Sequence, residues 1–213
     1  MYYLYGVVAG STDKTYFSEV GANKVAELVA TAFIKAFNLS STSKSEITPD
    51  NGIEDGTIYS LQNVNSGLYL EVQNGTAANG TNVQQWGARS IANHNAWKMV
   101  AVGNGEYKMY SCVGDGSYLL DVDSNAKTNG TNMQIYQDTS YDVQVFKIQK
   151  NGDGSYTIYT KLSNYQSCIE VKDALTSDGA NVQQWEVNSH SCQKWILEKV
   201  TMIHSQVRPN QAK

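Results

Sequence analysis

The sequence has no apolar run long enough to cross a membrane, which takes about 18 or more consecutive apolar residues, so no membrane partner is expected. It also has only three cysteines in 213 residues, Cys112, Cys168 and Cys192, with no CxxC pair among them. This odd and irregular set is not a disulfide framework, and we expect three free thiols; a single Cys168–Cys192 bridge is the alternative. The three histidines show no paired ligand spacing, so no metal site and no cofactor are expected.

Charged residues are also scarce. They make up 17% of the chain, and the formal net charge is -4. Such a mild acidic balance gives no electrostatic reason to expect nucleic acid or an anionic membrane surface as a partner. The N-terminus has no basic stretch leading into an apolar one, so no signal peptide is expected within this chain.

The composition instead favours short strands and many turns, with 17 glycines and 14 tyrosines against two prolines. One eight-residue segment occurs three times: NGTNVQQW at 79–86, NGTNMQIY at 129–136 and DGANVQQW at 178–185. The glutamines that these segments share are 50 and 49 residues apart, at Gln84, Gln134 and Gln183. A fixed period of this length indicates a fold built from repeats.

Each repeat carries the same further pattern. An acid lies thirteen residues before the glutamine, within YLEV, LLDV or CIEV: Glu71, Asp121 and Glu170. Upstream of it, alternating apolar residues, a polar turn and a second apolar run are typical of a hairpin. Units of about four short strands, covering residues 56–200, cannot each bury a face alone. We therefore predict an all-β fold in which the three repeats share one core around a pseudo-threefold axis and leave no open sheet edge. The aromatic residue that follows the glutamine by twelve or thirteen positions is expected to be buried in this core; these residues are Trp97, Phe146 and Trp195.

This pattern resembles the ricin-type β-trefoil lectins, the fold of the family 13 carbohydrate-binding modules. Repeats of that family close with a Q-x-W motif, and the closing motifs here read NAW at 95–97, QVF at 144–146 and QKW at 193–195. The resemblance covers residues 56–200 and implies a β-trefoil of three repeats of about 50 residues. It also implies sugar binding and an extracellular, secreted bacterial setting.

Sugar recognition needs an aromatic plate for the C–H face of a ring and fixed polar groups for its hydroxyls. A carboxylate accepts hydrogen bonds from two neighbouring hydroxyls, and an amide both donates and accepts. The repeats supply this set up to three times. The candidate sugar-binding residues are Glu71, Gln84, Trp86, His94 and Asn95 in the first repeat, Asp121, Gln134 and Tyr136 in the second, and Glu170, Gln183, Trp185, Asn188 and His190 in the third.

The chain departs from the family pattern at several of these positions. Glutamate replaces the family's aspartate at Glu71 and Glu170, and the family's asparagine position holds Val143 and Cys192 in the second and third repeats. The aromatic plates Trp86 and Trp185 are expected to be partly exposed at the surface, whereas Trp97 and Trp195 are expected to be buried.

Residues 1–38 differ in character from the repeats. Apolar residues recur there at helical spacing and predict one amphipathic helix: Val25, Leu28, Val29, Ala32, Phe33 and Ala36. Residues 39–55 are rich in Ser and Thr and are predicted to be a linker, and residues 201–213 a tail. The apolar face of the helix is expected to pack on the trefoil or on a second chain.

This N-terminal segment resembles the C-terminal end of GDSL-type (SGNH) rhamnogalacturonan-acetylesterase-like domains, which end in Asp-x-x-His, F-x-E-x-GA and a final helix. The Asp position is Asp13, but the His position is Tyr16, which is not a general base near neutral pH. A block carrying a nucleophilic serine is absent, so no catalytic residue is expected and the chain is predicted not to be an enzyme.

The predicted function is that of a carbohydrate-binding module. It would hold a plant-polysaccharide-degrading enzyme against its partner, a cell-wall poly- or oligosaccharide, without making or breaking a bond. Two alternatives stay open: a non-catalytic fragment of a GDSL-type esterase, and a β-trefoil that binds protein.

Overall fold

The computed structural model describes residues 51–87 and 93–200, which form twelve β-strands with short 3-10 helices between them. The strands are β1 (Ile58–Asn63), β2 (Tyr69–Val72), β3 (Thr81–Trp86), β4 (Trp97–Gly103), β5 (Glu106–Ser111), β6 (Tyr118–Val122), β7 (Thr131–Gln137), β8 (Phe146–Lys150), β9 (Tyr156–Thr160), β10 (Ser167–Val171), β11 (Val182–Glu186) and β12 (Trp195–Lys199). Repeat 1 holds β1 to β4, repeat 2 holds β5 to β8, and repeat 3 holds β9 to β12. Within these residues no helix has the length and apolar character of a membrane span.

Six of the strands form a closed antiparallel ring. β1 pairs with β4 and β12, β5 pairs with β4 and β8, and β9 pairs with β8 and β12. Each repeat therefore contributes its first and fourth strand to one barrel, which leaves no unpaired edge along the ring.

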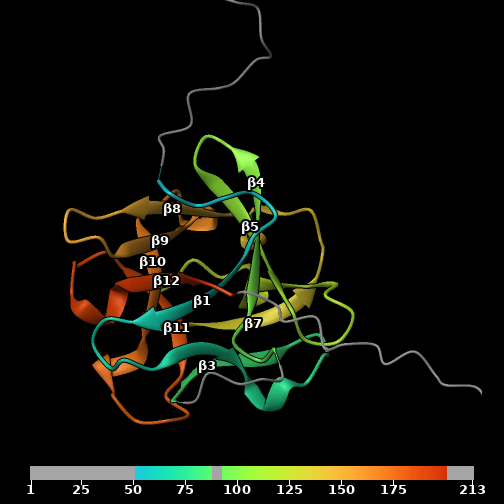
Figure 1. Ribbon diagram of the computed structural model, residues 1–213, viewed down its shortest axis with the longest axis horizontal. Coiled ribbons are helices and arrows are strands. Elements are labelled where there is room, and N and C mark those ends of the chain that lie inside the picture. Colours follow the sequence, from blue (N-terminus) through green and yellow to red (C-terminus); the bar gives the residue numbers. More distant parts are fainter. Residues whose placement is uncertain (1–50, 88–92, 201–213) are drawn as a thin grey trace, which may run out of the picture. The chain divides into compact units, whose positions relative to one another are not determined.

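The other six strands form three hairpins, β2–β3, β6–β7 and β10–β11. β7 also pairs with β3 and β11, and a bridge between Gln84 and Asn181 joins β3 to the residue before β11. Figure 1 shows β3, β7 and β11 gathered together on one side of the ring. A six-stranded barrel capped by three hairpins is a β-trefoil, so the predicted all-β trefoil with three repeats is confirmed.

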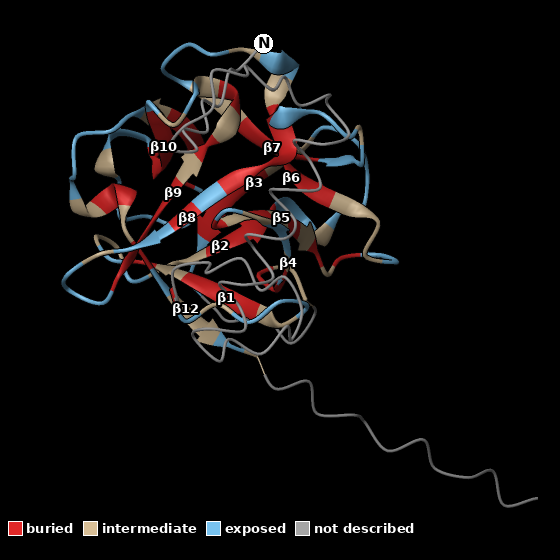
Figure 2. Ribbon diagram, turned by 90° about the horizontal axis from the view of Figure 1, so that it is seen from above, coloured by how far each residue is buried: buried red, intermediate tan, exposed pale blue. Residues whose placement is uncertain are grey.

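The core lies where the repeats meet, and Figure 2 shows its buried segments running along the strands. Side chains alternate between the core and the outside along each strand. In β5 the side chains of Tyr107, Met109 and Ser111 are buried, and those between them are not. The aromatic residues that begin β4, β8 and β12 are fully buried, namely Trp97, Phe146 and Trp195. This confirms that these three residues, and not the plates, fill the core.

The two buried tryptophans also satisfy their ring N–H groups. Trp97 Nε1 donates to the carbonyl of Leu70 at 3.0 Å, and Trp195 Nε1 donates to that of Ile169 at 3.4 Å. Both acceptors lie one residue before the acid of the same repeat. The core aromatic thus ties the barrel to the strand that carries the candidate site.

Several predictions concern residues outside this part of the chain: the helix over 25–36, the 1–38 segment that carries it, and the 201–213 tail. The predicted linker, 39–55, is described only from residue 51. There Asn51 is buried, accepts a hydrogen bond from Tyr107 at 3.1 Å and donates one to the carbonyl of Ile148 at 3.1 Å. The chain is therefore anchored to the barrel before β1 begins.

Candidate functional site

An acid and a glutamine face each other across each hairpin. The strand register opposes Glu71 to Gln84, Asp121 to Gln134 and Glu170 to Gln183. In each pair the glutamine Nε2 donates to the carboxylate, at 2.9, 2.9 and 3.0 Å respectively. The spacing of thirteen residues seen in the sequence is the distance around one hairpin, and the longer Glu side chain makes the same bond as Asp.

All six members of these pairs are buried. A buried carboxylate is costly unless it is hydrogen-bonded, and here the amide N–H of the glutamine supplies that bond. The pairing also fixes which way each amide points, with its nitrogen on the acid. Each repeat thus presents a pre-oriented carboxylate–amide pair.

An aromatic ring stands beside each pair, two residues after the glutamine and on the same face of the strand. Trp86 is 42% exposed and Tyr136 is 36% exposed, whereas Trp97 and Trp195 are fully buried. Trp185 is half-buried. The prediction that Trp86 and Trp185 are partly exposed while Trp97 and Trp195 are buried is confirmed, and the role of the exposed rings as plates stays a prediction.

Each plate is held from both sides by a turn of another repeat. The turn glycine donates its N–H to the carbonyl just before the plate: Gly80 to Ile135 at 2.9 Å, Gly130 to Gln184 at 2.8 Å and Gly179 to Gln85 at 2.9 Å. The Asn or Asp before that glycine accepts from the N–H just after the plate: Asn79 from Gln137 at 2.9 Å, Asn129 from Glu186 at 2.8 Å and Asp178 from Gly87 at 2.6 Å. The turn of repeat 1 therefore holds the plate of repeat 2, that of repeat 2 holds repeat 3, and that of repeat 3 holds repeat 1.

Glycine is needed in these turns because the backbone there has positive φ, 81° at Gly80, 84° at Gly130 and 77° at Gly179. Gly179 also faces the plate directly: a methyl group added to it would lie 3.8 Å from the ring of Trp86. The eight-residue segment is thus written three times because it serves two sites at once. Its first two residues position a neighbour's plate, and its last three supply a glutamine and a plate of their own.

This arrangement predicts an effect across repeats. Asp178→Ala removes the acceptor for the Gly87 N–H, so binding at Trp86 should weaken about threefold to tenfold, the worth of one hydrogen bond of about 0.5–1.5 kcal/mol. Asp178→Asn should restore binding, because Asn79 and Asn129 make the same bond elsewhere. The measurement is ligand-induced change of tryptophan fluorescence in a Trp185→Phe background, where Trp86 is the one exposed tryptophan of the described residues. Unchanged binding at Trp86 in Asp178→Ala, or failure of the Asn variant to restore it, would contradict this prediction.

The glutamine of the closing motif supports the loop that follows each plate. In repeat 2, Gln144 Oε1 accepts from the Thr139 N–H at 2.9 Å, and its Nε2 donates to the carbonyl of Gln137 at 2.9 Å. In repeat 3, Gln193 accepts from Asn188 at 2.9 Å and donates to the carbonyl of Glu186 at 2.9 Å. Asn95 holds the corresponding place in repeat 1 and is also buried.

In repeat 3 both carboxylate oxygens of Glu170 have partners. Gln183 donates to Oε1, and Gln193 Nε2 donates to Oε2 at 2.8 Å. Around them lies a hollow of about 420 Å³, lined also by Trp185, Asn188 and His190. The side chains of Asn188 and His190 accept hydrogen bonds from backbone N–H groups of their own turn, those of His190 at 2.9 Å and Cys192 at 3.2 Å.

The cysteines of this region are free thiols. Cys192 Sγ lies 3.9 Å from Glu170 Oε2, and burial and the nearby Glu170 raise its pKa to about 11. The pKa of the buried Cys168 thiol is raised further, by burial first and then by Glu170. Thiols in this state are poor nucleophiles, so they act here as packing groups.

Repeat 1 differs because a histidine lies against its backbone. A methyl group added to Gly75 would come within 2.1 Å of His94 Nε2, so only glycine leaves room for the ring. Asn125 and Ala174 hold the corresponding position in the other repeats. His94 therefore fills space against the short 3-10 helix Gln73–Gly75 that follows β2.

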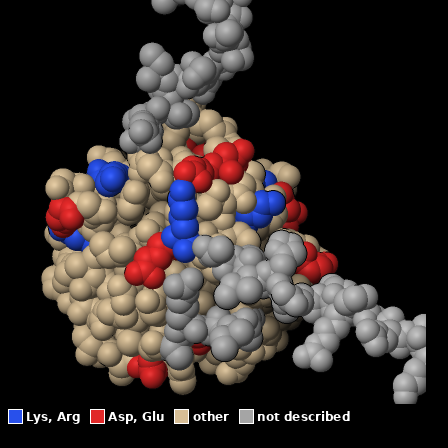
Figure 3. Space-filling view, viewed as in Figure 1, with Lys and Arg blue, Asp and Glu red and all other residues tan. Residues whose placement is uncertain are grey.

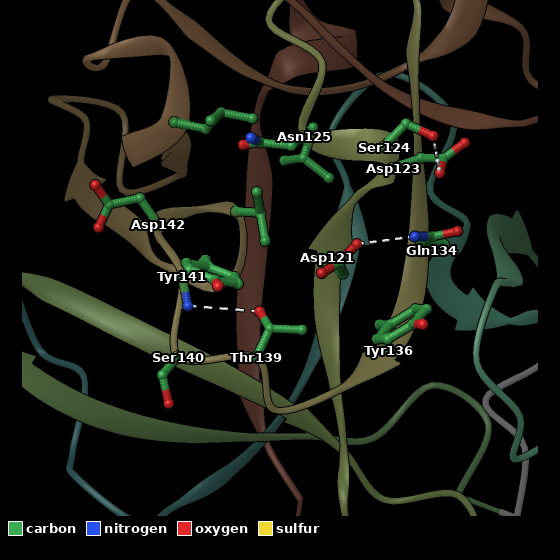
Figure 4. A pocket seen from close by; sticks show the side chains of 13 residues that line it. Asp121, Asp123, Ser124, Asn125, Gln134, Tyr136, Thr139, Ser140, Tyr141 and Asp142 are labelled. Atoms are coloured by element: carbon green, nitrogen blue, oxygen red, sulfur yellow. Dashed lines mark hydrogen bonds between the residues drawn. The ribbon is translucent and has the colours of Figure 1, made fainter.

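Repeat 2 has the larger hollow, about 780 Å³, around the Asp121–Gln134 pair (Figure 4). Burial raises the pKa of the Asp121 carboxyl, and the hydrogen bond from Gln134 opposes this. The structure places in this hollow residues that the sequence did not single out, notably Asp123, Tyr141 and Asp142. The structure also gives a role to three residues outside this hollow that hold the plates, Asn79, Asn129 and Asp178. Their recurrence in the repeated segment is the sequence signal that could have identified them.

Three acid–amide–aromatic sets on a trefoil define a lectin-like class of domain, and comparison with known families agrees. The family described as ricin-type beta-trefoil lectin domain-like matches residues 48–136, 93–185 and 142–209. The chain belongs to this family. It is a ricin B-type lectin-like carbohydrate-binding domain, a non-catalytic fold. The esterase resemblance of residues 1–38 receives no support from these comparisons.

Solved structures give the same fold. A designed threefold-symmetric protein, ThreeFoil, is 32% identical over 67% of this chain and 98% of its own, with a TM-score of 0.62. An exo-beta-1,3-galactanase from Clostridium thermocellum is 31% identical over 70% of this chain, with a TM-score of 0.63, but the match spans 31% of that enzyme. The Rhizoctonia solani agglutinin, 19% identical over 70% of this chain and 98% of its own with a TM-score of 0.60, shares the fold. No curated protein sequence matches the chain at a significant level.

Proposed function

We propose that this domain binds plant cell-wall polysaccharide through its acid–amide–aromatic sets and holds a polysaccharide-degrading enzyme against that substrate. The observation that carries the proposal is the threefold recurrence of a buried carboxylate–glutamine pair beside an aromatic ring, at 2.9, 2.9 and 3.0 Å. The pair accepts from and donates to neighbouring hydroxyls, and the ring covers a C–H face of the sugar.

Three sites on one body favour a polymer over a single sugar. Once one site is occupied, the others meet the same chain at high effective concentration, so affinity rises without new contacts. The surface fits an uncharged partner: Figure 3 shows acidic and basic side chains interspersed on a largely uncharged face. Such a surface does not favour nucleic acid.

The link to an enzyme is supported by the galactanase, which carries a similar domain in a longer chain. An extracellular bacterial setting belongs to the same proposal, since cell-wall polysaccharide lies outside the cell. The gene that encodes this chain, or its neighbour, should therefore encode a glycan hydrolase or esterase.

The test is polysaccharide binding by variants that lack the plates. Trp86→Ala and Trp185→Ala should each weaken binding at their own site about tenfold, since stacking contributes about 0.5–1.5 kcal/mol beyond burial. The melting temperature should barely change, because both rings lie at the surface. Ile196→Ala, a half-exposed apolar residue of β12, is the control and should leave affinity unchanged.

Calorimetric titration with soluble galactan and xylan, together with thermal melts, measures both quantities. If the double variant keeps its full affinity, or unfolds, the assignment of the sites is wrong. If no glycan binds the unaltered protein, the carbohydrate-targeting proposal fails and a trefoil that binds protein becomes the better account.

A further inference from the structure

The hollow of repeat 2 has aromatic rings on two sides. Tyr136 comes from β7 and Tyr141 from the residue before the 3-10 helix Asp142–Gln144, and both line the hollow together with Asp121 and Gln134. Figure 4 shows the two rings on either side of Asp121. Asp121 therefore lies between two rings and not beside one (Figure 4).

Tyr141 is 71% exposed, the largest fraction among the exposed large hydrophobic side chains of the described residues. The loop that presents it is nevertheless fixed. Asp138 accepts from the Ser140 N–H at 2.8 Å and pairs with Lys108 at 2.8 Å, and Gln144 holds Thr139. An exposed ring on a pre-organised loop can bind a ligand with little loss of conformational entropy.

Repeat 3 provides the internal comparison. His190 holds the place of Tyr141 there, and the hollow is about 420 Å³ against about 780 Å³ in repeat 2. Repeat 2 thus has both the additional room and the additional ring that a second sugar unit requires.

The charge of this hollow restricts what can enter it. Asp121, Asp123 and Asp142 line it, and none of the described residues that line it is Lys or Arg. Asp142 pairs with Lys161, whose Nζ lies 3.5 Å from Asp142 Oδ1 but only 3.1 Å from Glu106 Oε2. A sugar that carries its own carboxylate would be repelled.

Resting on the proposed function, we propose that repeat 2 binds two consecutive neutral sugar units of a glycan. One unit stacks on Tyr136 and is held by Asp121 and Gln134, and the next stacks on Tyr141. The three carboxylates exclude uronic acids, so the ligands are neutral galactans or xylans and not pectic galacturonan.

The experiment isolates repeat 2 in a Trp86→Ala/Trp185→Ala background and measures binding by calorimetry. Galactose is compared with β-1,3-galactobiose, and xylose with xylobiose. At least one disaccharide should bind about tenfold more tightly than its monosaccharide, the worth of one additional stacked ring. Tyr141→Ala should abolish this gain while keeping the affinity for the monosaccharide, and Tyr141→Phe should preserve it. Val102→Ala, an exposed apolar residue of β4 that lies outside the hollow, is the control and should change nothing.

A second arm tests charge with digalacturonate, which should bind at least about tenfold more weakly than galactobiose at low salt. Asp123→Asn/Asp142→Asn and 1 M salt should each narrow this difference. Asp153→Asn also removes a carboxylate that is paired with a lysine, but this residue lies outside the hollow. This control should therefore leave the difference between the two disaccharides unchanged. If sugars bind but the disaccharides gain nothing through Tyr141, or digalacturonate binds equally well, this inference is wrong while the proposed function stands. If no sugar binds the unaltered protein, the proposed function fails first.

Discussion

Trp195→Ala is expected to lower the free energy of unfolding by about 3–5 kcal/mol, the usual cost of removing a large buried aromatic side chain. Trp195 is fully buried, begins β12 and donates to the carbonyl of Ile169. The truncation leaves a cavity where the repeats meet and removes the hydrogen bond to the Ile169 carbonyl next to Glu170. Chemical denaturation followed by fluorescence or circular dichroism measures the loss.

Trp185→Ala is the matched control, because it removes the same side chain ten residues earlier, from a half-buried position. Its stability should stay close to that of the unaltered protein. If Trp195→Ala yields no soluble protein, Trp195→Phe keeps the test open: repeat 2 already has Phe146 at this place, so that variant should fold with a smaller loss. Equal stability of Trp195→Ala and Trp185→Ala would contradict the division into core and plate.

Asp121→Asn is expected to weaken sugar binding at repeat 2 about tenfold to a hundredfold, since hydrogen bonds to a charged group contribute about 1.5–3 kcal/mol. The substitution keeps the size of the side chain and its contact with Gln134, so only the charged acceptor is lost. Measured in the Trp86→Ala/Trp185→Ala background, the change reports this site alone. Glu170→Gln in the same background is the control and should have little effect. Unchanged affinity in Asp121→Asn would show that repeat 2 is silent.

The same carboxylate gives a pH dependence. Burial raises the pKa of Asp121 above the ordinary aspartate value of about 3.9. As pH falls through the raised pKa, the carboxylate is protonated and sugar binding at repeat 2 should fall, at a higher pH than an exposed aspartate would require. Titration with a neutral disaccharide from roughly pH 7 to pH 4 measures it.

The effect of this group on stability has the opposite sign. Because its pKa is higher in the folded than in the unfolded state, protonation favours the fold; this stabilising contribution is full below the unfolded pKa and is lost as pH rises through the folded pKa. Loss of binding with an intact melt at the lower pH would therefore identify Asp121 as the group that titrates. If binding is lost only where the protein also unfolds, the loss does not identify Asp121.

The sequence by itself determined what lies within one repeat. Local alternation of apolar and polar residues indicates the hairpins, and the distance around one hairpin pairs each acid with its glutamine. The position of each aromatic in the repeat separates plates from core residues. All three patterns occur once in each repeat. The closed barrel also follows, because units of this size can bury their apolar faces only against one another.

Only the tertiary structure decided what lies between repeats. Which turn holds which plate depends on how β3, β7 and β11 pair, so the roles of Asn79, Asn129 and Asp178 could not be read along the chain. The hollow of repeat 2 likewise needs the segments around Asp123 and Tyr141 to meet, and the exposure of a ring is set by its neighbours. Periodic local patterns specify strands and hairpins, whereas contacts between distant segments depend on register and packing, which a single sequence does not contain.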